Sequence, residues 1–110
     1  SLAPKSGAYN PVYVGGQAQR DAAYHQGTVW PWLSGFYLET CLKIYKRSGL
    51  SWVDRCFLGF EEEMNYHCIG TLPELFDGNP PFSGRGALSF AMNVAAVLRV
   101  NKVLSKFYNY

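Results

Sequence analysis

Two stretches of the sequence carry side chains that could do chemistry. The first groups aromatic, imidazole and amide side chains within nine residues, in the run Tyr24-His25-Gln26-Gly27-Thr28-Val29-Trp30-Pro31-Trp32. Aromatic faces stack on the C–H face of a pyranose ring, and planar polar side chains hydrogen-bond to neighbouring hydroxyls. This aromatic run is therefore typical of a sugar-binding surface, and the alternative is an aromatic anchor that holds a loop on a core.

The second stretch places a carboxylate among apolar residues. Glu74 lies between Pro73 and Leu75, so water reaches it from part of its surroundings only. A carboxylate in that position must be paired or functional, because its desolvation is costly. Glu74 is accordingly the best candidate for a catalytic residue. Asp77 precedes Gly78 and is more simply a turn residue that accepts local backbone N–H bonds, with substrate binding as the alternative.

Three helices are expected to position these two stretches. Apolar residues recur at spacings of three and four over approximately residues 31–46, 51–66 and 87–107. Pro31 suits the first turn of a helix, Gly49 is a stop signal, and Ser51 is a suitable N-cap. The sequence therefore predicts an all-α protein.

The remaining segments, residues 1–30 and 68–87, are rich in Gly and Pro and lack a helical period. We expect them to be irregular. Long loops then lie at one end of the helices, and a short turn joins the first two helices at the other end. Functional sites gather on long loops that a rigid scaffold holds in place.

Apolar residues are more abundant than three helices can cover. Hydrophobic residues make up 48% and aromatic residues 16% of the 110 residues. The third expected helix is apolar around most of its circumference, except for a stripe that we expect to be solvated, formed by Arg99, Lys102 and Lys106. We therefore expect a piece of a larger protein, whose apolar faces meet the rest of that protein or a second copy.

Charge, cysteine spacing and hydropathy exclude several classes of function. The net charge is +2 and no basic patch accompanies exposed aromatics, so we expect no nucleic-acid partner. Cys41, Cys56 and Cys68 have no CxxC spacing, and the pair His67-Cys68 is too small for a metal site, so we expect no metal and no cofactor. Neither a signal peptide nor a membrane span is expected. Unpaired thiols suit a reducing compartment, the cytoplasm.

Together the two stretches resemble the C-terminal, amylo-α-1,6-glucosidase domain of the glycogen debranching enzymes. The resemblance covers roughly residues 8–105 and includes Arg85-Gly86-Ala87 and the small-residue helix that ends in Val97-Leu98-Arg99. It implies an (α/α)6 barrel, of which this chain is the C-terminal part, and hydrolysis of α-1,6-linked glucose in glycogen or a limit dextrin. At residues 88–93 the family pattern leads us to expect a more polar sequence that contains Gln and Trp. The sequence found there departs from this pattern.

The resemblance also implies roles for individual residues. The family inverts the anomeric configuration with two carboxylates, and Glu74 matches the general base. The general acid is an Asp in an earlier part of the barrel, so these 110 residues alone are expected to be inactive. Asp77 follows the base in the same run. The sugar pocket would be shaped by Tyr24, His25, Gln26, Trp30 and Trp32.

Two other functions remain open. One is a carbohydrate-binding module that kept the loops and lost catalysis, and the other is a helical interaction domain whose apolar faces dock on a partner. The uncovered apolar faces weigh against a self-contained module, whereas Glu74 favours the enzyme.

Overall fold

Helices dominate the computed structural model, which describes residues 1–66 and 68–108. In chain order the elements are α1 (Gln17–Ala23), α2 (Pro31–Tyr45), the 3-10 turn η1 (Lys46–Gly49), α3 (Leu50–Glu63), β1 (Leu75–Phe76), β2 (Gly84–Arg85) and α4 (Ala91–Tyr108). The predicted all-α class is confirmed, since the strands in the described residues are two residues long. The two helices α2 and α3 form where the apolar spacing predicts them, and Pro31 occupies the first turn of α2.

The third long helix, α4, begins at Ala91 rather than at Ala87. Ala87 is held in a loop because its carbonyl accepts the Glu74 N–H at 2.9 Å, and its own N–H donates to Glu74 Oε2 at 3.3 Å. Phe90 N donates to Leu72 O at 2.8 Å. The segment before α4 therefore pairs with the loop that carries Glu74, and these contacts outweigh its helical spacing.

Two short elements correct the expectation that residues 1–30 and 68–87 are irregular. The first is α1, in which every residue except Asp21 is a strong helix former, and whose first turn is closed by a 2.8 Å hydrogen bond from Gly16 N to Gln19 Oε1. The second is the antiparallel pair of β1 with β2. Val29 also exchanges backbone hydrogen bonds of 2.8 and 2.9 Å with Phe76, so the aromatic run and the Glu74 loop are directly joined.

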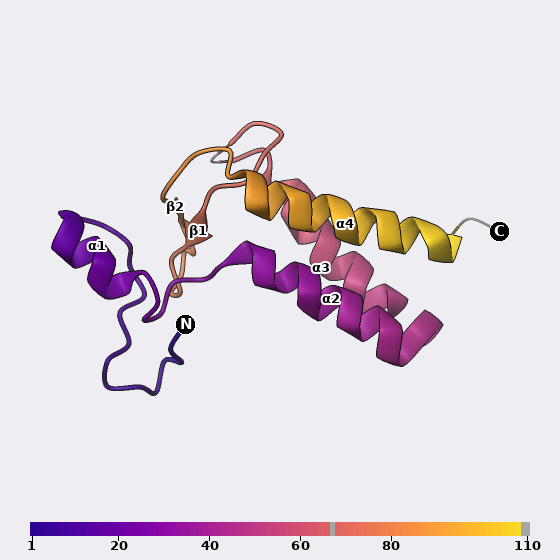
Figure 1. Cartoon of the computed structure of the whole chain (residues 1–110), viewed down its shortest axis with the longest axis horizontal. Coiled ribbons are helices and arrows are strands. Elements are labelled where there is room, and N and C mark those ends of the chain that lie inside the picture. Colours follow the sequence, from indigo (N-terminus) through magenta and orange to yellow (C-terminus); the bar gives the residue numbers. More distant parts are fainter. Residues whose placement is uncertain (67, 109–110) are drawn as a thin grey trace.

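The helices α2 and α4 lie side by side and run parallel. Trp32 N donates to Asn93 Oδ1, Gly35 lies against Ala96, and Glu39 pairs with Arg99, so contact positions advance together along both helices. A Cβ at Gly35 would lie 3.1 Å from the Ala96 Cβ, so the missing side chain permits the close approach. Both helices begin at the end that carries α1, β1 and β2, whereas η1 lies at the other end (Figure 1). The predicted gathering of the long loops at one end is confirmed.

A compact core joins the three long helices. Leu38 and Leu42 of α2 are 2% and 1% exposed, and they pack with the buried residues Cys41, Val53, Val100 and Leu104. Burying one such leucine stabilises the fold by about 1.5–3 kcal/mol. Phe57, Phe60 and Phe107 flank the core and are half-buried.

The face of α2 opposite the core is apolar as well. Phe36, Tyr37 and Ile44 are 62%, 56% and 65% exposed, and Leu33 is 48% exposed. The radius of gyration, 15.1 Å, exceeds the value of about 13 Å expected for a compact domain of this length. An exposed apolar face of this kind is expected if part of the surrounding protein is missing. The partner that would cover it stays a prediction.

The three cysteines are free thiols, as the sequence spacing indicates. Cys41 and Cys68 are buried and Cys56 is half-buried, where burial raises the pKa of its thiol. Within the part of the chain that the structure describes, no helix has the length and apolar character needed to cross a membrane.

An ion-pair cluster ties α2 to α4. Glu39 is 8% exposed and accepts hydrogen bonds from Arg99 Nε at 2.8 Å and Arg99 Nη2 at 3.1 Å, while Lys43 Nζ lies 3.2 Å from its Oε1. The hydrogen bonds from Arg99 and then Lys43 outweigh burial and lower the pKa of Glu39 from 4.5 to about 2. Arg99 is exposed, as the predicted solvated stripe requires, and its guanidinium also links α4 to Glu39 of α2.

This cluster makes stability depend on pH. Because the pKa of Glu39 is depressed in the folded state, its contribution is complete above the ordinary value and is lost as the pH falls from about 4.5 towards 2. We expect Glu39→Gln to lower the thermal unfolding midpoint at neutral pH, and the difference from the unsubstituted protein to shrink over that acid range. Glu62→Gln on the exposed side of α3 is the matched control. Equal midpoints at neutral pH would contradict the assignment.

Candidate active site

Glu74 lies just before β1, at the end of the molecule where α2 and α4 begin. Its side chain is half-buried, as its position beside Pro73 indicates. The Glu74 N–H donates to Ala87 O at 2.9 Å, and the Glu74 carbonyl accepts Asn93 Nδ2 at 2.7 Å. The backbone of Glu74 is therefore fixed by Ala87, which precedes α4, and by Asn93 in the first turn of α4.

Two donors orient the Glu74 carboxylate. Tyr24 Oη donates to Oε1 at 2.7 Å, and Ala87 N donates to Oε2 at 3.3 Å. Each carboxylate oxygen has two lone pairs, so a water molecule or a substrate hydroxyl can still bind to either oxygen. The arrangement holds the group in place without using its full capacity as an acceptor.

The contact with Glu74 also changes Tyr24. The hydrogen bond to Glu74, burial, and the charges of Glu74 and Tyr13 together raise the pKa of Tyr24 from 10 to about 12. Tyr24 is therefore a phenol at neutral pH and remains a hydrogen-bond donor to the carboxylate.

Glu74 faces a polar pocket with a volume of about 510 Å³. Arg20, Arg85 and Tyr13 line this pocket together with Glu74. Arg20 belongs to α1 and Arg85 to β2, the two elements that the sequence did not predict. The spacing of the sequence gives no signal for Tyr13, which lies in the N-terminal segment, far from Glu74 along the chain.

An aromatic cluster lies next to this pocket. The rings of Tyr24 and Trp30 meet edge to face at 4.5 Å, and His25 stacks on Trp30 with centroids 5.5 Å apart and an interplanar angle of 18°. Trp30 Nε1 donates to Tyr24 O at 2.9 Å. Trp32 joins Tyr24, His25 and Trp30 around a pocket of about 340 Å³, so four residues predicted to bind sugar come together there.

Gln26 does not line either of these pockets. Its backbone N–H donates to Ala23 O at 3.0 Å, and its carbonyl accepts Asn10 N at 2.6 Å. Gln26 therefore contributes to the loop that carries the aromatic cluster, and its predicted contact with sugar stays a prediction.

Asp77 forms a buried polar contact between distant segments. Asp77 is 4% exposed, its Oδ1 accepts Tyr13 N at 3.0 Å, and its Oδ2 accepts Arg85 Nε at 3.1 Å. Arg85 Nη2 lies 3.0 Å from the same Oδ2. The simpler interpretation, a carboxylate that binds a backbone N–H, fits this geometry, but the donor is 64 residues away rather than local. In this position Asp77 holds Arg85 and Tyr13 beside Glu74.

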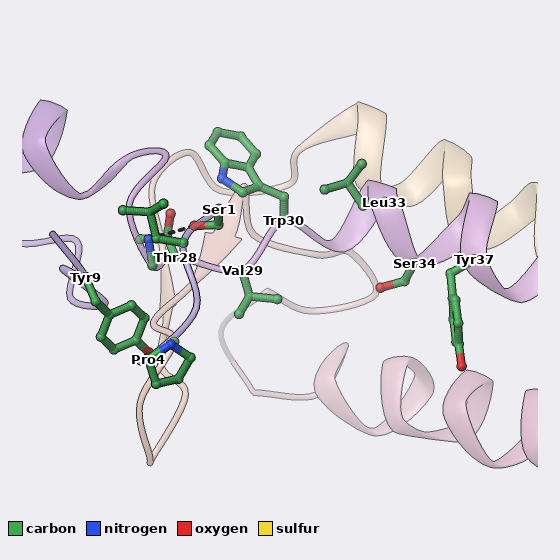
Figure 2. Close-up of a pocket in the computed structure, with 12 residues that line it drawn as sticks. Ser1, Pro4, Tyr9, Thr28, Val29, Trp30, Leu33, Ser34 and Tyr37 are labelled. Atoms are coloured by element: carbon green, nitrogen blue, oxygen red, sulfur yellow. Dashed lines mark hydrogen bonds between the residues drawn. The ribbon is translucent and has the colours of Figure 1, made fainter. Parts of the chain in front are cut away.

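A further hollow of about 430 Å³ lies beside the N-terminal segment (Figure 2). Ser1, Tyr9 and Trp30 line it together with Tyr37 of α2. Of the predicted site residues, only Trp30 lines this hollow. No Asp or Glu is among the described lining residues. The pocket of Glu74, which carries a carboxylate, is therefore the better candidate for an active site.

Metal ligands are not grouped in the described residues. Residues 1–66 and 68–108 contain no set of three or more His, Cys, Asp or Glu side chains that could hold a metal ion. His67, considered above with Cys68, lies outside the described residues.

Comparison with known proteins gives a match over most of the chain. A family model described as amylo-alpha-1,6-glucosidase matches residues 1–99. The matched region contains the aromatic cluster, Glu74 and the first half of α4. No curated protein and no solved structure matches the chain significantly.

The geometry around Glu74 predicts the effect of adding one methyl group. Gly86 has a φ of 75°, and a Cβ there would lie 2.9 Å from Glu74 Cβ and from Glu74 Oε2. We expect Gly86→Ala to displace the carboxylate and to destabilise the fold by about 1–3 kcal/mol. Chemical denaturation would measure this change.

The matched control for Gly86→Ala is Gly59→Ala in α3, where a Cβ meets nothing within 4 Å. Alanine is the better helix former, so this control should stabilise the protein by about 0.5–1 kcal/mol. Equal effects of the two substitutions would show that Gly86 has no special contact with Glu74.

Proposed function

This chain belongs to the amylo-alpha-1,6-glucosidase family, and we propose that it forms part of a glycoside hydrolase that removes α-1,6-linked glucose at the branch points of glycogen or a limit dextrin. One observation carries the proposal. The Glu74 carboxylate, oriented by Tyr24 Oη at 2.7 Å, borders a polar pocket and lies next to an aromatic cluster suited to sugar.

In the proposed reaction Glu74 is the general base. A water molecule bound to the carboxylate gives a proton to Glu74 while its oxygen attacks the anomeric carbon, and the bond from that carbon to the glycosidic oxygen breaks. The leaving oxygen takes a proton from a general acid, which we propose is an Asp outside this chain. Inversion requires the two carboxyl groups to lie roughly 6.5–9.5 Å apart, with room for the water between them.

The neighbours of Glu74 have separate tasks in this mechanism. Tyr24 occupies one lone pair of Oε1 and Ala87 N one lone pair of Oε2, so the second lone pair of either oxygen can bind the attacking water molecule. Arg20 and Arg85 offer N–H donors for sugar hydroxyls. Trp30 and Trp32 offer aromatic faces for the glucose ring.

We further propose that this chain contributes the C-terminal helices of an (α/α)6 barrel. The exposed apolar face of α2, with Phe36, Tyr37 and Ile44, supports this proposal because further helices of a barrel would cover it. The piece alone would then lack both a closed pocket and the general acid. The free thiols Cys41, Cys56 and Cys68 support a cytoplasmic location.

The general-base role makes a direct prediction. In the intact protein that contains this chain, we expect Glu74→Gln to lower kcat by about 10²–10⁴-fold, because the amide cannot accept the proton of the attacking water. Release of glucose from a dextrin with a single α-1,6-linked glucose measures the rate. Glu62→Gln, a carboxylate-to-amide change on the exposed side of α3, is the control and should leave the rate unchanged. A near-normal rate for Glu74→Gln would remove Glu74 from the base role.

A further inference from the structure

Asn93, in the first turn of α4, has a fully buried side chain at the junction of the two predicted stretches. Its Nδ2 donates to Pro73 O and to Glu74 O, both at 2.7 Å. Its Oδ1 accepts the Trp32 N–H at 3.0 Å. One amide therefore contacts the Glu74 loop and the start of α2 at once.

This set of bonds uses both amide donors of Asn93. An aspartate would place a carboxylate oxygen against two carbonyl oxygens, and a leucine of similar size would leave the carbonyls of Pro73 and Glu74 without a donor. Buried polar groups that lose their partners carry a large free-energy penalty. The site therefore requires an asparagine for chemical reasons, beyond the space that its side chain fills.

Asn93 also supplies a cap that α2 lacks. The N-cap residue Trp30 makes no side-chain capping hydrogen bond, and the first N–H groups of any helix have no partner within the helix. Trp32 N–H is one of these groups, and Asn93 satisfies it from the neighbouring helix. The start of α2, where both Trp30 and Trp32 lie, is thus fixed relative to the Glu74 backbone.

We propose that Asn93 is a positioning residue of the glycosidase, which sets the distance between the Glu74 carboxylate and the aromatic pocket of Trp30 and Trp32. This inference rests on the proposed function. The alternative is that Asn93 stabilises the fold without affecting the reaction. The two differ in kinetics, because misplacement of a reacting group by about 1 Å can reduce the rate about 10²-fold, whereas loss of stability leaves each folded molecule as active as before.

The test uses the intact protein and the same α-1,6-branched dextrin. Asn93→Ala removes all three hydrogen bonds, and Asn93→Ser keeps one donor and is the milder change if the alanine variant folds poorly. Asn101→Ser makes the same change at an exposed position of α4. Val100→Ala removes core volume in the same helix and serves as the control for lost stability. Rates are expressed per folded molecule, with the folded fraction taken from circular dichroism.

We expect both Asn93 variants to lower kcat by at least about 10-fold while KM changes by less than about 3-fold, and the acid limb of the pH–rate profile to move. Asn101→Ser and Val100→Ala should keep the kcat and the profile of the unsubstituted enzyme. If Asn93→Ser matches Val100→Ala in kcat per folded molecule, the positioning role is wrong. If Glu74→Gln itself retains normal activity, the proposed function fails, and that outcome is distinct from an Asn93 effect alone.

Discussion

The parallel packing of α2 against α4 is the constraint on which the rest of the structure depends. Gly35 lets the helices approach at Ala96, and Glu39 binds Arg99 one turn further along. Because the helices are parallel, both N-termini lie at one end, and the loops that lead into them must meet there (Figure 1). The aromatic run leads into α2 and the Glu74 loop leads towards α4, so helix packing brings these distant segments together, and the backbone bonds between Val29 and Phe76 join them directly.

The spacing of apolar residues predicts the long helices, because a helix that packs on one face has apolar residues at every third or fourth position. The same rule fails for α1, which is only seven residues long and leaves Ala23 as its one buried residue. It fails again at Ala87, where hydrogen bonds with Glu74 override the local spacing. Short elements held by contacts with distant residues leave little periodic signal in the sequence.

The residues of the candidate site likewise divide into those that the sequence pattern predicts and those that only contacts between distant residues reveal. Glu74, Trp30 and Trp32 are predictable, because a shielded carboxylate and clustered aromatics are unusual in any loop. Asn93 is not predictable in this way, since its partners are backbone groups at positions 19 to 61 residues away. In the sequence it interrupts an apolar helix, and it ends the stretch 88–93, which as a whole is less polar than the family pattern leads us to expect. Any residue type supplies the same backbone N–H and C=O groups. A side chain that binds such groups therefore has no recognisable partner residue in the sequence.

The uncovered surface of α2 bears on the site as well as on stability. Trp32 packs edge to face on Phe36, with ring centroids 5.9 Å apart, and both border an apolar groove of about 330 Å³ that also contacts Met92 and Arg99. A helix that covered the exposed face of α2 would restrict Phe36, and through Phe36 it would restrict the ring of Trp32. Asn93 fixes only the backbone N–H of Trp32, so the ring depends on its outer neighbours. Closing the apolar face and completing the proposed sugar pocket are therefore one structural requirement.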